Sequence, residues 1–239
     1  MAKTVADVMK LVKENEVKFV DFRFTDTRGK QHHTTVPVSH FDEDKFISGH
    51  AFDGSSIAGW KGIEASDMQL IPDPNSANID PFFEETTLIL TCDVIEPSDG
   101  KSYDRDPRSV AKRAEAYLKA SGLGDTAFFG PEPEFFIFDG VRWSTEPNNT
   151  FYEIEEYEAP WNTGAKLEGG NRGHRPTVKG GYFPVPPVDS TQDMRAEMSL
   201  ILESLGIPVE VFHHEVAGAG QNAIGTRFST PVERADWPL

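Results

Sequence analysis

Residues 128–138 have the sequence FFGPEPEFFIF, an aromatic and apolar stretch that predicts a buried strand, because such side chains fill a pleated, packed surface well. Glu132 and Glu134 interrupt it two residues apart. Alternate side chains of a strand share a face, so these carboxylates are expected on one face, about 7 Å apart. Like charges in apolar surroundings are costly unless a cation neutralises them, and oxygen ligands suit Mg²⁺ or Mn²⁺. The alternative is an exposed edge strand with two solvated glutamates beside a proline.

The composition limits the classes of partner. The chain has 239 residues with a net charge of −16, from 39 acidic and 23 basic residues. This balance disfavours nucleic acid as a partner, since a phosphate-backbone binder needs a basic surface. Cys92 is the single cysteine, which excludes an intramolecular disulfide framework. The N-terminus lacks the apolar core of a signal peptide and no apolar run is long enough to span a membrane, so we expect a cytoplasmic protein.

The first hundred residues predict a small α+β unit. Apolar residues at helical spacing predict a helix over 5–14, capped by Thr4. The other expected elements are a hairpin of strands 17–25 and 31–38, a short helix over 41–47, a loop over 52–60, a loop over 70–74 and the residues after it, and a strand over 86–94. A polar connection begins at Glu96, so the expected domains are residues 1–100 and 101–239.

The second part predicts alternating helices and strands. A helix should begin at Asp106-Pro107 and end at Gly122. Its expected apolar stripe is Val110, Ala111, Ala114, Tyr117 and Leu118. The later expectations are a polar, acidic segment over 148–160, a long loop over 161–181, a helix over 190–205 whose methionines pack in the core, a strand over 208–216 and a turn over 218–222.

A second cluster of ionisable residues, EVFHHE at 210–215, has apolar neighbours that predict a buried or half-buried strand. Ionisable groups in such a place mark a site more often than they serve packing. His213 and His214 are each as consistent with a satisfied core histidine as with a site residue. Glu215 is the better candidate for a metal ligand, because it ends the strand beside the Gly-Ala-Gly turn.

Four short motifs together carry a family resemblance. They are FGPEPEFF at 129–136, DGSSI at 53–57, KGGYFP at 179–184 and HHEV at 213–216. In this order they are specific, and the chain resembles bacterial type I glutamine synthetase from about Asp7 to Trp237. The resemblance implies an N-terminal β-grasp domain followed by an incomplete catalytic α/β domain, an α+β fold class. It also implies ATP-dependent ligation of ammonium to glutamate through γ-glutamyl phosphate, in a homo-oligomer, a dodecamer in the family, with active sites between subunits.

The resemblance also implies roles for individual residues. Glu132, Glu134 and Glu215 match divalent-metal ligands, for Mg²⁺ or Mn²⁺ that bridge phosphate oxygens. Asp53 matches the carboxylate that binds ammonium and helps deprotonate it; its alternative is an Asx turn before Gly54.

Three further positions match the family pattern. Tyr182 matches a residue that helps close the ammonium site. Glu210 and Phe228 match ATP-contacting positions, with Phe228 as the platform for adenine, although Phe228 alone indicates ordinary core packing.

Two departures qualify this resemblance. Where the family has a further metal-binding glutamate, this chain has Ala223, and a methyl group cannot coordinate a cation. Family chains also continue for about as long again, with further metal, triphosphate and glutamate ligands. We therefore expect little or no activity from this chain alone. The alternatives are a non-catalytic remnant that associates with full-length subunits, or a γ-glutamyl ligase for a larger amine.

Overall fold

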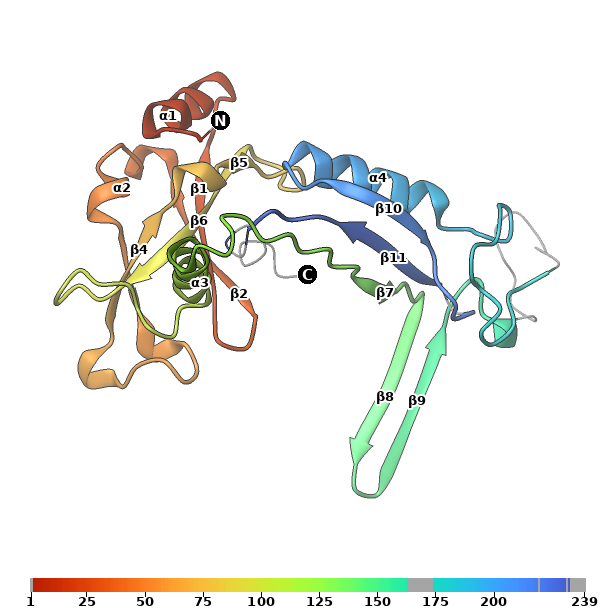
Figure 1. Cartoon of the computed structure of the whole chain (residues 1–239). Coiled ribbons are helices and arrows are strands. Elements are labelled where there is room, and N and C mark those ends of the chain that lie inside the picture. Colours follow the sequence, from red (N-terminus) through yellow and green to blue (C-terminus); the bar gives the residue numbers. More distant parts are fainter. Residues whose placement is uncertain (1, 163–173, 219, 231, 233–239) are drawn as a thin grey trace. The chain divides into compact units, whose positions relative to one another are not determined.

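The chain folds into two compact units in a computed structural model (Figure 1). The residues that the structure describes are 2–162, 174–218, 220–230 and 232. The first unit is Met1–Phe129 with Phe228–Leu239, and the second is Gly130–Arg227. Within the described ranges, no helix is long and apolar enough to cross a membrane.

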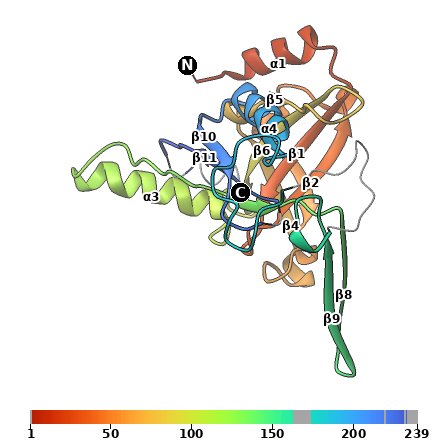
Figure 2. The ribbon, with the colours of Figure 1, turned by 90° about the vertical axis from the view of Figure 1, so that its right-hand side faces the viewer.

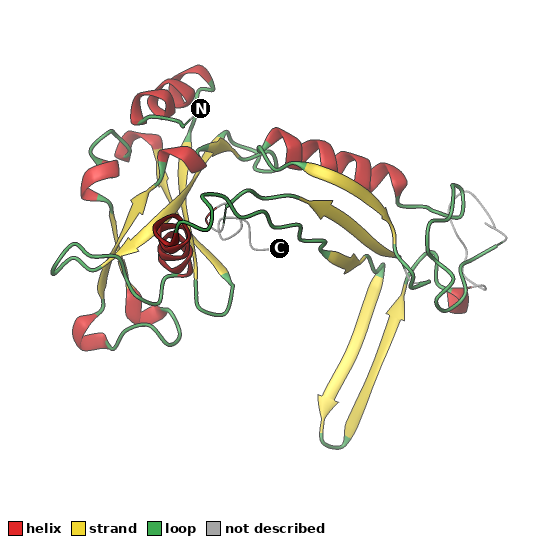
Figure 3. Ribbon diagram, in the orientation of Figure 1, coloured by secondary structure: helices red, strands yellow, loops and turns green. Residues whose placement is uncertain are grey.

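The first unit is built on a six-stranded sheet with the order β2-β1-β6-β4-β3, in which β5 also pairs with β6 (Figure 3). Strands β1 and β6 are parallel and the other pairs are antiparallel. The helices and strands are α1 (Val5–Glu14), β1 (Phe19–Thr25), β2 (Gln31–Pro37), α2 (Lys45–Ser48), β3 (His50–Asp53), β4 (Asp67–Pro72), β5 (Asn78–Ile79), β6 (Thr87–Ile95) and α3 (Pro107–Ser121). Short 3₁₀ helices lie at Val38–His40, Gly54–Ser56, Ile63–Ala65 and Pro74–Ser76.

The core of this unit lies between the sheet and its covering segments. Strand β6 is central, and Leu88, Leu90 and Val94 along it are fully buried. Helix α1 has the predicted bounds, and Thr4 caps it by accepting a hydrogen bond from the Asp7 amide. The helix buries Val8 against the core. The predicted α1 helix and β1–β2 hairpin are confirmed.

Two local predictions in the first unit are wrong. The segment predicted as a loop from Leu70 onward contains the end of β4, where Leu70 is fully buried, and the short strand β5. Strand β3 also extends into the predicted 52–60 loop, as far as Asp53. Pairing between neighbouring strands overrides the local signals of Pro72 and Gly54, because tertiary context decides strand formation.

Helix α3 has the predicted cap and end but a different buried face. The Asp106 carboxylate accepts the amides of Arg108 and Ser109, and Gly122 closes the helix with φ 70°. Three residues of the predicted stripe, Val110, Ala114 and Tyr117, are exposed, and Ala111 and Leu118 are only half-buried. Arg108 and Ser109 are buried instead. The Arg108 guanidinium pairs with Asp93 and Asp73, at 2.6 and 2.5 Å, and these ion pairs replace apolar contact as the anchor.

The second unit is a three-stranded antiparallel sheet, β10-β11-β7, with α4 along one face (Figure 1). A separate hairpin, β8–β9, projects from this unit as a narrow ribbon (Figure 2). The elements are β7 (Glu134–Phe136), β8 (Gly140–Glu146), β9 (Asn149–Glu155), a 3₁₀ helix at Pro160–Asn162, α4 (Gln192–Ser204), β10 (Val209–His214) and β11 (Gln221–Thr226). Helix α4 and strand β10 confirm two predicted elements.

The prediction of a buried strand over 128–138 is wrong for the described structure. Only Glu134–Phe136 form a strand, which lies at the edge of the sheet. Phe128 is 69% exposed, and Phe136, Ile137 and Phe138 are exposed as well. The reason is that β7 has a paired neighbour on one side only and α4 packs on β10 and β11. The exposed edge strand, stated above as the alternative, is the observed one.

Two further sequence predictions in this unit need correction. The polar segment over 148–160 contains β9, which forms a hairpin with β8 whose faces are both largely exposed. The turn predicted over 218–222 is shorter, because β11 begins at Gln221. The predicted loop over 161–181 includes 163–173, which lie outside the described residues, and 174–181 contain no helix or strand.

Helix α4 is anchored by a buried arginine. Arg195 has no exposed surface, and its guanidinium donates to Asn222 Oδ1 at 2.5 Å on β11 and pairs with the Asp189 carboxylate. Met194 and Met198, which we predicted as core residues, are only half-buried. The helix is therefore fixed by a polar contact that apolar periodicity does not reveal.

The prediction for this anchor concerns stability. Arg195→Ala leaves the Asp189 carboxylate buried without its cation, which costs about 3–5 kcal/mol. Leu200→Ala on the exposed side of the same helix should change stability by about 0.5 kcal/mol or less. Urea unfolding followed by circular dichroism compares the two variants. Equal midpoints for both would show that the arginine does not anchor the helix.

Candidate functional site

Strand register places the candidate side chains on one face of the three-stranded sheet. Glu134 on β7 lies opposite Ala223 on β11, which lies opposite His213 on β10. Because alternate residues of a strand share a face, Glu132 and Glu215 belong to the same face as this row. The sequence-based expectation that Glu132 and Glu134 share a face therefore agrees with the register.

The pairing continues beyond the ends of β7 and β10. The amides of Ile224 and Thr226 donate to the carbonyls of Pro133 and Pro131, at 3.3 and 3.0 Å. At the other edge, the Glu215 amide donates to the Gln221 carbonyl at 2.8 Å. The backbone of all three strands is thus held in register along the whole row of candidate ligands.

The central strand carries two small residues in this row of the sheet face, Ala223 and Gly225. Ala223 is fully buried. A Cβ atom on Gly225 would lie 2.8 Å from Val211 Cγ1, so a larger residue does not fit without movement. Across the central strand, His213 Nε2 lies 3.0 Å from Glu132 Oε1.

Three side chains meet on this face of the sheet with metal-ligand spacing. Glu132, His213 and Glu215 each offer one ligand atom, and these atoms all lie within 4.8 Å of one another. His213 Nδ1 lies 3.6 Å from Glu215 Oε1. In the part of the chain that the structure describes, this is the only group of three or more such residues. We call Glu132, His213 and Glu215 the ligand cluster.

Glu134, the remaining predicted metal ligand, is held separately. Gln221 Nε2 donates to Glu134 Oε2 at 2.8 Å, and Gln221 Oε1 accepts the Ala217 amide at 3.0 Å. The structure therefore brings together two of the three predicted ligands, Glu132 and Glu215, and adds His213. Assignment of Glu134 to a metal stays a prediction.

Tyr182 lies beside the ligand cluster. The rings of Tyr182 and Phe183 are stacked, with centroids 3.9 Å apart. Both meet the His213 ring edge-on, at centroid distances of 5.8 and 4.8 Å. Gly181 donates its amide to the Val216 carbonyl at 3.0 Å, and a Cβ there would lie 2.7 Å from another backbone oxygen. Glycine therefore permits this close approach, which sets the two aromatic rings against His213.

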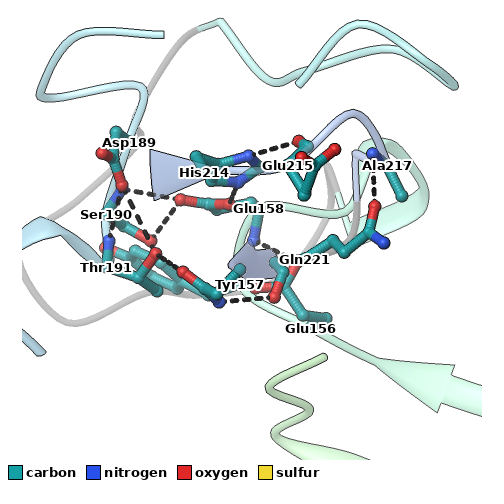
Figure 4. Close-up of polar contacts among 12 residues, drawn as sticks. Glu156, Tyr157, Glu158, Asp189, Ser190, Thr191, His214, Glu215, Ala217 and Gln221 are labelled. Carbon is teal, nitrogen blue, oxygen red and sulfur yellow. Dashed lines mark hydrogen bonds and ion pairs between the residues drawn. The ribbon is translucent and has the colours of Figure 1, made fainter. Parts of the chain in front are cut away.

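A buried ion pair between His214 and Glu158 holds the end of β10 on the face opposite the ligand cluster (Figure 4). His214 Nε2 lies 2.6 Å from Glu158 Oε2, and Nδ1 donates to the Glu215 carbonyl at 2.7 Å. The other Glu158 oxygen accepts the amide and hydroxyl of Ser190, at 2.6 and 2.5 Å. The adjacent histidines thus have different positions, with His214 in the interior and His213 in the ligand cluster.

The charges of this pair follow from its contacts. Burial opposes charge on both groups, but the contact with Glu158 raises the pKa of His214 above its ordinary value. Burial is likewise outweighed for Glu158, whose pKa is lowered by hydrogen bonds from His214 and Ser190. Sequence reasoning missed Glu158, because its partners are more than 30 residues away in the chain and the acidic segment around it indicates a solvated surface.

The other predicted site residues lie elsewhere. Asp53 ends β3, where its carboxylate accepts the Ser55 amide and hydroxyl at 2.8 and 2.6 Å. These hydrogen bonds lower the pKa of Asp53 and form the Asx turn named as its alternative. Asp53 belongs to the first unit and Tyr182 to the second.

The two predicted nucleotide-contacting residues differ in exposure. Glu210 lies at a bulge in β10, exposed, with its carboxylate 3.5 Å from the Arg227 guanidinium. Phe228 is 3% exposed and pairs with Phe129, as expected for a core residue. Their assignment to a nucleotide stays a prediction.

Comparison with known families assigns both parts of the chain. The sequence model "Glutamine synthetase, beta-Grasp domain" matches residues 16–97, and "Glutamine synthetase, catalytic domain" matches residues 104–239. The chain belongs to the glutamine synthetase family. The predicted resemblance and fold class are confirmed. The domain boundary near residue 100 stays a prediction, since the two compact units divide at residues 129–130.

Individual relatives cover the whole chain but about half of their own length. A Cupriavidus pinatubonensis protein named 3-hydroxylaminophenol mutase is 76% identical over 99% of this chain and 50% of its own. Vibrio cholerae glutamine synthetase is 57% identical over 98% of this chain and 50% of its own. A Plasmodium falciparum glutamine synthetase structure superposes with a TM-score of 0.83 at 26% identity, over 96% of this chain and 46% of its own. The chain thus spans about half the length of the curated relatives it matches.

The buried glutamate Glu156 allows a prediction of how the stability of the fold depends on pH. Burial raises the pKa of Glu156 from 4.5 to about 7. The folded chain then binds this proton more tightly than the unfolded chain, so the stability from protonation is complete below pH 4.5 and is lost as the pH rises through about 7.

Glu156→Gln removes the titration and keeps an oxygen that can accept the Glu158 amide. Relative to the unmodified chain, this variant should gain about 2 kcal/mol between pH 5 and pH 8, after discounting the full shift for solvent screening. Urea unfolding at both pH values measures the gain. Glu146→Gln, exposed on β8, is the control for loss of one charge. A gain that is the same for both variants would contradict the prediction.

Proposed function

We propose that the chain carries the N-terminal and catalytic-domain parts of a glutamate–ammonia ligase. Its reaction is amidation of glutamate with ATP, through γ-glutamyl phosphate, dependent on Mg²⁺ or Mn²⁺. The observation that supports this most is the ligand cluster on the open sheet face, in a chain of the glutamine synthetase family. Since the chain spans half of its relatives, the activity is proposed for the whole protein.

The donor atoms of the site fit a divalent cation. Glu132 and Glu215 supply carboxylate oxygens, which hard cations prefer, and Glu134 lies on the same face two residues from Glu132. A bound cation neutralises charge on phosphate oxygens during phosphoryl transfer. Ala223 supplies no donor at the centre of the face, so the metal affinity and rate of this chain should be low.

Asp53 is proposed to bind ammonium and accept its proton. Hydrogen bonds from Ser55 favour the ionised carboxylate, which is the form that attracts a cation. Oδ1 accepts two bonds from Ser55, whereas Oδ2 accepts a longer one from the Ser56 hydroxyl, at 3.3 Å. Oδ2 is therefore the oxygen better able to take an ammonium proton.

The remaining assignments rest on the family pattern. Tyr182 is proposed to close the ammonium site, and Glu210 and Phe228 to contact ATP. Asp53 would come from a neighbouring subunit in a homo-oligomer, and the protein would act in the cytoplasm. We propose neither nucleic acid nor a membrane as a partner.

A second candidate activity comes from the relative that is 76% identical, which is named a 3-hydroxylaminophenol mutase. A mutase moves a group within one molecule and needs neither glutamate nor ATP. Incubation of the protein with 3-hydroxylaminophenol, with and without ATP and glutamate, tests this activity. Conversion that is independent of both additions would favour the mutase.

The test of the ligase proposal is formation of γ-glutamyl hydroxamate from glutamate, hydroxylamine and ATP in the presence of Mn²⁺. We expect a low rate that Glu132→Gln abolishes. This control matters because the variant keeps the size of the side chain and removes its charge. No hydroxamate above background from the unmodified protein, folded by circular dichroism, would favour the non-catalytic alternative. Equal rates above background for the two proteins would contradict the role of Glu132. A product formed only with a larger amine would favour the related ligase.

Ala223 gives a sharper prediction. A glutamate at this position lies in the row between Glu134 and His213, so Ala223→Glu should tighten Mn²⁺ binding by about tenfold, because added ligand charge raises cation affinity. Ala120→Glu, exposed on α3, adds the same charge away from the site. Calorimetric titration of the three proteins decides the matter. If both substitutions tighten Mn²⁺ binding equally, the effect comes from the net charge of the protein and not from a ligand at position 223.

A further inference from the structure

The rings of Tyr182 and Phe183, which we call the aromatic pair, are stacked on each other beside His213. We propose that Phe183 is a positioning residue, whose left-handed backbone and ring together set the direction of the Tyr182 side chain. The inference rests on the proposed role of Tyr182 in closing the ammonium site. It goes beyond that role, because it names the residue that holds the tyrosine in place.

The backbone of Phe183 has an unfavourable conformation. Its φ angle is 55°, in the left-handed region that bulky side chains rarely adopt. Pro184 follows, and a residue before proline is also disfavoured in the right-handed helical region. Extended backbone is therefore the ordinary conformation for this position. A strained alternative persists only where surrounding contacts fix it, and such strain gathers at functional sites.

Two backbone hydrogen bonds fix the chain on either side of Tyr182. The Gly181 amide donates to the Val216 carbonyl at 3.0 Å, and the Phe183 amide donates to the His214 carbonyl at 3.4 Å. Both acceptors belong to the end of β10 and the residues directly after it. The segment is thus held against the strand that carries the candidate site, with Tyr182 between the two attachment points.

The left-handed backbone allows the two neighbouring rings to stack. In an extended chain, successive side chains point to opposite sides, so adjacent rings cannot lie face to face. Here the Tyr182 and Phe183 centroids are 3.9 Å apart and the ring planes differ by only 17°. Both rings meet the His213 ring edge-on, at 5.8 and 4.8 Å. With extended backbone, the Phe183 ring would point away and the tyrosine would lose this support.

Exposure argues against core packing as the reason for the strained conformation. Each ring of the aromatic pair is 57% exposed, so burial of apolar surface does little to offset the strain. What the conformation secures is the direction of the Tyr182 ring. A side chain exposed to this extent otherwise changes rotamer freely, and a displaced group at a reacting centre lowers the rate.

The first test is independent of activity. Incorporation of 3-fluorotyrosine labels five tyrosines, and Tyr182→Phe identifies the ¹⁹F signal of residue 182. Stacking should displace this signal from that of Tyr117, which is 78% exposed. Phe183→Ala should remove the displacement, and Phe183→Trp, which keeps an aromatic face, should retain it. Urea unfolding should give a higher midpoint for Phe183→Gly than for Phe183→Ala, because glycine adopts positive φ without strain.

The second test uses the hydroxamate reaction, in which hydroxylamine takes the place of ammonium. Phe183→Ala should raise the KM for hydroxylamine about tenfold, because the Tyr182 ring is no longer held in place. The KM for ATP should stay within about twofold, which a general loss of structure would not allow. Phe183→Trp should restore the KM for hydroxylamine.

The outcomes separate the inference from the proposed function. An undisplaced ¹⁹F signal in the unmodified protein, or a Phe183→Ala midpoint at or above that of Phe183→Gly, would overturn the inference. A KM for hydroxylamine that rises in Tyr182→Ala but not in Phe183→Ala would overturn it as well. If Tyr182→Ala also leaves this KM unchanged, the proposed role of Tyr182 fails, and the fluorine and urea readouts alone decide whether Phe183 positions the ring. They decide it in the same way if no hydroxamate forms.

Discussion

The guanidinium of Arg195, buried under α4, donates to Asn222 on β11 and pairs with Asp189. This contact fixes which face of the central strand turns toward the helix. Because side chains alternate, residue 223 must then face the opposite side, and the strands on either flank follow its register. A slip of β11 by one residue would turn residue 223 toward α4. The row in which residue 223 lies between Glu134 and His213 therefore depends on a polar contact on the other side of the sheet.

The neighbouring histidines illustrate how this constraint assigns roles that sequence leaves open. His213 and His214 have the same chemistry and the same apolar surroundings in the sequence, so neither could be assigned from composition. In this register the His214 side chain lies in the interior, where the Glu158 carboxylate balances its charge. The His213 side chain lies on the opposite face, in the ligand cluster. Glu158 lies 56 residues away in the chain, a separation at which local patterns carry no signal.

Prediction from sequence succeeded where the information is local. The cap of α1, the β1–β2 hairpin, the ends of α3 and the shared face of Glu132 and Glu134 follow from short-range patterns. Burial was predicted less well, because it depends on what covers a face. The sequence pattern predicts burial of the apolar stripe of α3 and of the residues around β7. In the part of the chain that the structure describes, these residues are half-buried or exposed. The β8–β9 hairpin was missed because both of its faces are largely exposed and so lack the alternation of a half-buried strand.

Charge balance links the unusual alanine to the chemistry of the site. Two carboxylates, from Glu132 and Glu215, match the charge of one divalent cation. A third carboxylate at position 223 would leave the occupied centre negative, which strengthens cation binding but repels an anionic substrate. Ala223 therefore changes more than affinity. It places a small apolar side chain at the centre of the row, between Glu134 and His213, where it offers neither charge nor a donor atom.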